Sequence, residues 1–101
     1  MTRRFRRAAS LAALALAVPA LHAQDEGRKL FTSVTPACAL CHALRDAGAT
    51  GEIGPSLDEL KPDRERVVKA LKNGIGQMPA FPQLSAAQVE ALANYVAQAA
   101  K

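Results

Sequence analysis

The residues best suited to chemistry form one short run, Cys38-Ala39-Leu40-Cys41-His42. Two thiols at this spacing lie on one turn of a helix, so both can add to the vinyl groups of the same haem. The residue that follows, His42, then directs its imidazole toward the iron. The run therefore predicts one covalently attached haem c, held by thioether bonds to Cys38 and Cys41 and ligated on its proximal side by His42.

Three other uses of the same residues are weaker. A disulfide between Cys38 and Cys41 would close a very short loop, with little entropic gain and with strained geometry. A thioredoxin-like redox pair expects a strand followed by a helix, and no segment of the chain predicts a strand. A structural zinc site needs four ligands, whereas this run supplies three and no partner cluster occurs elsewhere.

The second axial ligand follows from the few remaining candidates. Once residues 1–23 are set aside as a leader, His42 is the single histidine and Met78 the single methionine. Met78 lies in a loop at residues 74–82, where glycines allow close approach of the backbone and Pro79 stiffens the chain. A lone methionine can also fill a core, but such residues usually lie on a periodic helical face. Because a soft thioether suits haem iron, we expect His42 and Met78 to be the two metal ligands.

Residues 1–23 have the three parts of a secretory signal peptide. Four arginines occur in the first seven positions, an apolar run follows, and Leu21-His22-Ala23 forms a small-residue exit before Gln24. Cleavage before Leu21 is the alternative. The apolar run of about 14 residues is shorter than the ~20 that a membrane span needs. We therefore expect a cleaved signal peptide at 1–23, one domain at 24–101, export to the periplasm, and no membrane span after cleavage.

The charge of the chain excludes a nucleic-acid partner. The chain has 13 Lys and Arg against 9 Asp and Glu, a formal charge of +4. Four of the basic residues belong to the expected leader, so the remaining domain is formally neutral, with three aromatic residues. Such a domain offers neither a polybasic surface nor a stacking platform for bases.

Helices must position the predicted ligands. Caps support two of them: Asp63 begins one helix that Gly74 ends, and Ser85 with Gln88 forms a capping box for the last. A small domain with long loops has a thin protein core, so we expect the haem to fill it. The apolar spacing predicts three helices, at residues 25–34, 63–73 and 85–100, with Gly/Pro-rich loops at 48–62 and 74–82.

This combination resembles the class I c-type cytochromes, which are small monohaem proteins with His and Met ligands. The resemblance covers residues 24–101 and rests on the order and spacing of Cys38-to-His42, Gly54-Pro55 and Met78-Pro79. It implies an all-α cytochrome c fold, in which three to four helices and long Gly/Pro loops wrap around one covalent haem. The first helix would cross the last at residues 92–95. It also implies that the Pro55 carbonyl accepts the N–H of the proximal imidazole.

The resemblance implies an electron-transfer protein and not an enzyme: a periplasmic carrier between a redox donor and a redox acceptor. Two alternatives stay open, a haem-bearing subunit of a larger oxidoreductase and a ligand-binding haem enzyme. The enzyme would need a distal acid–base group. The candidates are Tyr95, better explained as a partner of Phe31 across the helix pair, and Arg45, a surface or propionate-facing charge.

Two further features concern partners. The loops at 46–55 and 74–81 are similar to those of bacterial cytochromes that serve periplasmic sulfite dehydrogenases. A sulfite dehydrogenase or a terminal oxidase is therefore the expected partner. The basic residues of the helix at 63–73 form either a docking patch or a solvated helix face, and interleaved acidic residues favour the solvated face. They are Arg64, Arg66, Lys69 and Lys72.

Overall fold

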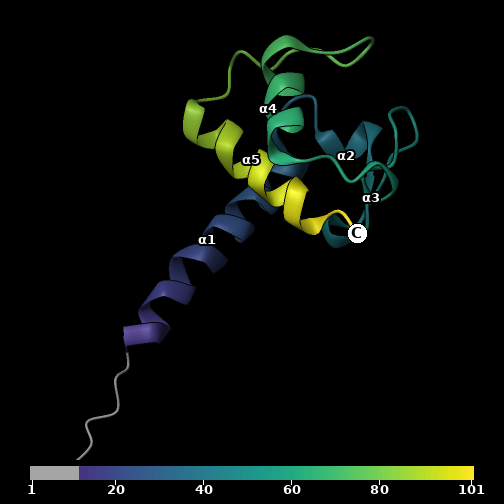
Figure 1. Ribbon diagram of the computed structural model, residues 1–101. Helices are drawn as coiled ribbons and strands as arrows, with labels where there is room; N and C mark the ends of the chain where they lie inside the picture. Colours follow the sequence, from purple (N-terminus) through teal and green to yellow (C-terminus); the bar gives the residue numbers. More distant parts are fainter. Residues whose placement is uncertain (1–11) are drawn as a thin grey trace, which may run out of the picture.

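A long N-terminal helix and a C-terminal helix cross to form the frame of the molecule, and the remaining elements lie to one side of this pair (Figure 1). The computed structural model describes residues 12–101, and for residues 12–21 only the backbone. The elements of this part are α1 (Ala12–Ser33), α2 (Cys38–Cys41), β1 (Ala43–Leu44), the 3-10 helix η1 (Arg45–Ala47), β2 (Ala49–Thr50), α3 (Leu57–Leu60), α4 (Arg64–Asn73) and α5 (Ala86–Ala99).

The crossing of α1 and α5 depends on a glycine. A β-carbon on Gly27 of α1 would lie 2.6 Å from the carbonyl oxygen of Ala91 in α5, so no larger residue fits between the helices. One turn further along α1, Phe31 packs edge-on against Tyr95, with ring centroids 6.2 Å apart and planes inclined by 65°. The predicted crossing of the first and last helices, and the predicted pairing of Tyr95 with Phe31, are confirmed.

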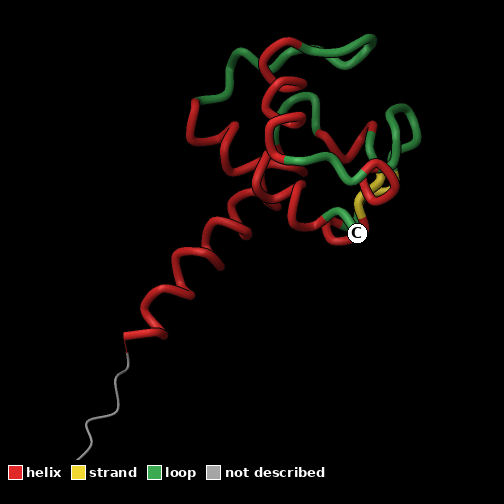
Figure 2. The backbone as a smooth tube through the Cα atoms, viewed as in Figure 1, coloured by secondary structure: helices red, strands yellow, loops and turns green. Residues whose placement is uncertain are grey.

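Side-chain caps set the ends of α4 and α5. Asp63 accepts a hydrogen bond from the backbone N–H of Arg66, and Gly74 ends α4 with a φ of 69°. Ser85 and Gln88 form the predicted capping box of α5. Both helices therefore lie within one residue of the predicted bounds. Figure 2 shows that extended loops join α3 to α4 and α4 to α5.

Three details differ from the prediction. The first helix begins at Ala12 and not at residue 25, because the alanines and leucines before residue 25 favour a continuous helix. The single turns α2 and α3 bring the count to five α-helices among residues 12–101, since four residues are too few for a periodic signal. The chain also has a strand pair that we did not predict: Ala43 pairs with Thr50, and Leu44 with Ala49.

The expected leader overlaps this first helix. Residues 1–11 lie outside the described part of the chain, and residues 12–23 belong to α1. Among residues 12–101, no helix combines the length and the apolar character that a membrane crossing requires.

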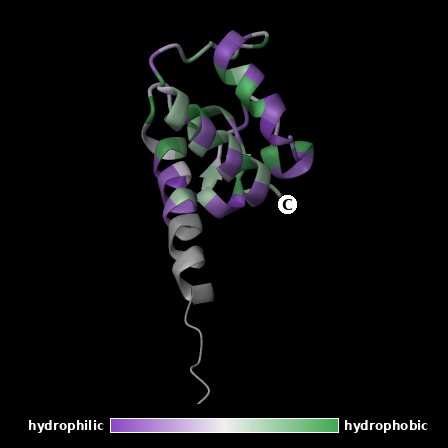
Figure 3. Ribbon diagram, turned by 60° about the vertical axis from the view of Figure 1, so that its left-hand side comes forward, coloured by the Kyte–Doolittle hydropathy of each residue, from purple (hydrophilic) through white to green (hydrophobic). Residues whose placement is uncertain are grey.

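The hydrophobic core lies between the crossed helices and the segment that follows α2. Its largest fully buried side chains are those of Tyr95, Phe31, Leu44 and Leu92. Hydrophobic and hydrophilic residues alternate along the helices, as expected when one face packs inward and the other meets water (Figure 3). Phe31 also forms part of the wall of a large cavity on the side of α4, so the core and this cavity share a wall.

Candidate functional site

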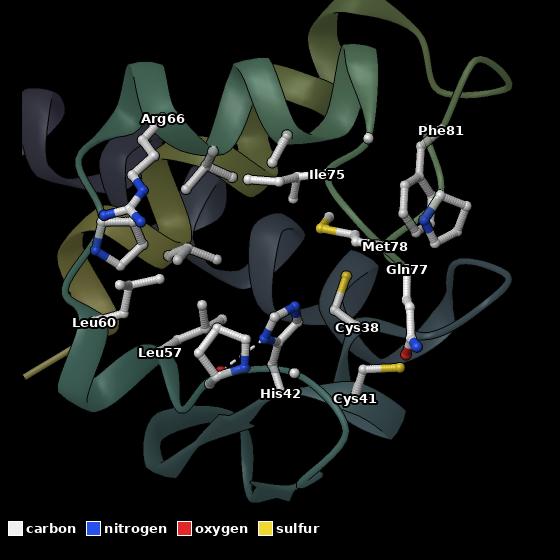
Figure 4. A pocket seen from close by; sticks show the side chains of 18 of the residues that line it. Cys38, Cys41, His42, Leu57, Leu60, Arg66, Ile75, Gln77, Met78 and Phe81 are labelled. Atoms are coloured by element: carbon white, nitrogen blue, oxygen red, sulfur yellow. Dashed lines mark hydrogen bonds between the residues drawn. The ribbon is translucent and has the colours of Figure 1, made fainter.

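The cavity has a volume of about 620 Å³ and is enclosed by α2, the loop before α3, α4 and the loop that follows α4. This volume is within the range of small-molecule and cofactor sites. All five predicted site residues line it: Cys38, Cys41, His42, Pro55 and Met78. The structure thus brings together residues that are separated by up to half of the chain (Figure 4).

The two cysteines lie on the single turn of α2, and both thiols are free. Their sulfur atoms mark one end of the cavity in Figure 4. Burial raises the pKa of the Cys38 thiol to about 11, so this group is a neutral thiol at neutral pH. The chain after β2 runs directly against α2, since a β-carbon on Gly51 would lie 2.7 Å from the carbonyl carbons of Leu40 and Cys41. Gly51 therefore fixes the position of the turn that carries both thiols.

His42 follows α2 directly and is held by the loop before α3. Its Nδ1 lies 2.8 Å from the carbonyl oxygen of Pro55. A carbonyl can only accept, so Nδ1 carries the proton and Nε2 keeps its lone pair. A β-carbon on Gly54 would lie 2.5 Å from His42 Cε1. The ring is therefore clamped between backbone atoms, with one nitrogen left for a metal.

Met78 lies on the opposite side of the cavity from His42, with its sulfur directed inward (Figure 4). The loop that carries it is rigid: Ile75 and Met78 exchange two backbone hydrogen bonds, of 3.0 and 2.9 Å. Gly74 and Gly76 supply the left-handed backbone that this tight turn needs, with φ of 69° and 55°. The loop is tied back to α4 by a bond of 2.7 Å from the Phe81 N–H to the Leu71 carbonyl.

The residues of the cavity fit a haem c. An imidazole nitrogen and a thioether sulfur face each other, and this is an axial pair that binds haem iron in cytochromes. The two free thiols stand at one end, and the walls are mostly apolar, as a porphyrin requires. The apolar wall includes Phe31, Leu57, Leu60, Val67, Phe81 and Val96.

Two other candidates from the sequence lie away from the cavity. The Tyr95 hydroxyl donates to the Asp46 carboxylate at 2.6 Å. Arg45 is not propionate-facing: its side chain is 80% exposed, forms an ion pair with Asp58 at 3.8 Å, and donates to the Lys101 carbonyl. Neither group can act as an acid or a base at a ligand in the cavity.

Sequence reasoning missed two contributions to the site. The close approach of Gly51 and Gly54 to α2 and His42 has no signal other than the glycines themselves. The basic residues of α4 also divide in a way that their spacing does not reveal. Arg64 pairs with Glu90 of α5, whereas Arg66 and Lys69 line the cavity.

The matches to known proteins extend over the segment that forms the cavity. A family described as "Cytochrome C oxidase, cbb3-type, subunit III" matches residues 22–96. Among solved structures, the c-type cytochrome SorU from Sinorhizobium meliloti is similar to this chain, with a TM-score of 0.77 and 52% identity. The match covers 79% of this chain and 93% of that one. No curated protein sequence matches.

Proposed function

This chain belongs to the c-type cytochrome family, and on that premise we propose that it is a one-electron carrier that works through one covalently bound haem c. In this proposal Cys38 and Cys41 form the thioether bonds, and His42 and Met78 are the axial ligands. Pro55 orients the imidazole. When bound, the haem supplies a reversible one-electron couple.

The observation that carries the proposal is the placement of His42 and Met78 on facing walls of one cavity (Figure 4). With both axial positions taken by protein side chains, no position is left for a substrate. The Pro55 carbonyl holds the ring of His42, and the hydrogen-bonded loop holds Met78. The same two side chains can therefore serve both oxidation states with little rearrangement, and methionine ligation favours a raised potential.

A second candidate has the same haem chemistry in a different setting. The matching family is described as a subunit of a cbb3-type cytochrome c oxidase, which favours a haem-bearing subunit of a larger oxidoreductase as the alternative. The carrier and the subunit differ in their affinity for a partner protein. A ligand-binding haem enzyme is the weakest candidate, because Tyr95 and Arg45 are engaged elsewhere.

We place the mature protein in the periplasm, after removal of residues 1–23. The support is the sequence pattern of that segment, namely arginines, an apolar run and a small-residue exit. The first α1 residue that packs closely on α5 is Gly27, which lies on the mature side of the proposed cut.

We propose redox proteins as the partners, with a sulfite dehydrogenase as donor and a terminal oxidase as acceptor. The support for the donor is the similarity of the loops at 46–55 and 74–81 to those of cytochromes that serve such enzymes. Both loops border the proposed haem site, since they contain Gly54, Pro55 and Met78.

Intact-mass spectrometry and visible spectra of the exported protein test the proposal together. We expect a chain that begins at Gln24 and carries the mass of one haem, with spectra that change reversibly on reduction and reoxidation. A haem-free protein would contradict the proposal, as would a haem removed by acidified organic solvent, which leaves thioether bonds intact.

A further inference from the structure

One cation on the wall of the cavity has no protein partner for its charge. Arg66 of α4 lines the cavity, and Figure 4 shows its side chain at the end away from Cys38 and Cys41. Within residues 12–101, its guanidinium forms no ion pair with a carboxylate. By contrast, Arg64 pairs with Glu90 on the neighbouring helix.

The charged residues of the cavity wall are of one sign. Arg66 and Lys69 line it, and no aspartate or glutamate of the described residues does so. Cations on an otherwise apolar wall favour a ligand that carries carboxylates at its edge. A guanidinium binds a carboxylate with two parallel hydrogen bonds, which an ammonium cannot do.

The covalent chemistry of haem sets which edge faces Arg66. The two propionates belong to the two pyrrole rings opposite those that carry the vinyl groups. With the vinyl groups joined to Cys38 and Cys41 at one end of the cavity, the propionates must lie toward the other end. That is the end where Figure 4 places Arg66 and Leu60.

We propose that Arg66 binds a haem propionate and thereby raises the reduction potential of the haem. This inference rests on the proposed haem site. An ionised propionate favours the more positive ferric state, and a paired guanidinium offsets that negative charge. Arg66 is thus a positioning residue that acts on the iron through the propionate and does not touch the metal.

The test compares Arg66→Gln, Arg66→Lys and the control Lys72→Gln in the haem-loaded protein. Lys72 lies on the same helix and is exposed, and it does not line the cavity, so its loss gives the same change in net charge. We expect Arg66→Gln to lower the midpoint potential below that of Lys72→Gln, and to shift the propionate bending band in the resonance Raman spectrum. Arg66→Lys should restore part of the potential while the band remains shifted.

Equal potentials and unshifted bands in Arg66→Gln and Lys72→Gln would overturn the inference and leave Arg66 on a solvated helix face. A shift in Lys69→Gln and not in Arg66→Gln would also overturn it, since Lys69 would then be the partner. If Arg66→Gln does not retain haem, Arg66→Lys decides: an unshifted band contradicts the inference. A wild-type protein without covalent haem is a separate result, because it refutes the proposed function.

Discussion

The hydroxyl of Tyr95 and the carboxylate of Asp46 form a hydrogen bond of 2.6 Å that joins α5 to the segment after the haem-attachment motif. Arg28 of α1 donates to the same carboxylate oxygen from two nitrogens, at 3.0 and 3.3 Å. One carboxylate therefore links α1, η1 and α5. Hydrogen bonds from Tyr95 and Arg28 hold the pKa of Asp46 below its usual range. Burial, followed by the bond to Asp46, raises the pKa of Tyr95 to about 12.

This link predicts a loss of stability at alkaline pH. Because the pKa of Tyr95 is raised in the folded state, its contribution is complete below the usual value of 10.0 and is lost as the pH rises to about 12. Tyr95 is the one tyrosine of the chain, so Tyr95→Phe should remove this part of the alkaline loss. At neutral pH the variant should cost about 1 kcal/mol. Urea unfolding of both proteins across this pH range measures the difference; parallel curves would show that the bond contributes nothing.

Replacement of Gly54 should disturb the proximal side of the site. The β-carbon of Gly54→Ala would press on the His42 ring, which has backbone atoms on its other side. We expect the Nδ1 bond to Pro55 to be strained, the ferric spectrum to change, and the protein to lose about 1–3 kcal/mol of stability.

The matched control for Gly54→Ala is Glu52→Ala, an exposed position two residues earlier in the same loop. Its spectrum and unfolding midpoint should equal those of the wild type. If Gly54→Ala behaves like this control, the ring of His42 is not clamped as the structure shows.

The haem-free chain should be largely unfolded. Replacing both Cys38 and Cys41 with alanine removes the attachment, and the apolar walls of a cavity of about 620 Å³ would then meet water. We expect low helical content by circular dichroism and no cooperative thermal transition. Leu40→Ala is the control, because Leu40 lies between the two cysteines and is 65% exposed. A cooperative melt of the double variant would mean that the protein core alone suffices.

The sequence predicted the parts of this molecule that depend on local rules. Caps at Asp63, Gly74 and Ser85 leave local signatures, and they set α4 and α5 to within one residue. The strand pair of β1 and β2 was missed because two residues give no alternation to detect. The single turn α3 was missed for the same reason, since one turn gives no helical period.

The site divides along the same line. Residue type and spacing identified the two cysteines, His42, Pro55 and Met78, and the fold gathers all five around one cavity. The position of Arg66 on the cavity wall depends on how α4 is rotated about its axis, and the division of its cations into paired and unpaired is a tertiary property. The same holds for Arg45, whose partners Asp58 and Lys101 lie far along the chain.

The axial role of Met78 is the central claim of the carrier proposal, and the weak red band of Fe(III)–methionine bonding tests it most directly. We expect the band in the wild type and in Gln77→Ala, an exposed neighbour in the same loop, and its loss in Met78→Ala. That variant should keep its covalent haem, bind carbon monoxide or imidazole, and have a lower reduction potential. A wild type without the band, or a Met78→Ala protein that retains it, would contradict the account and favour a haem protein with an open distal position.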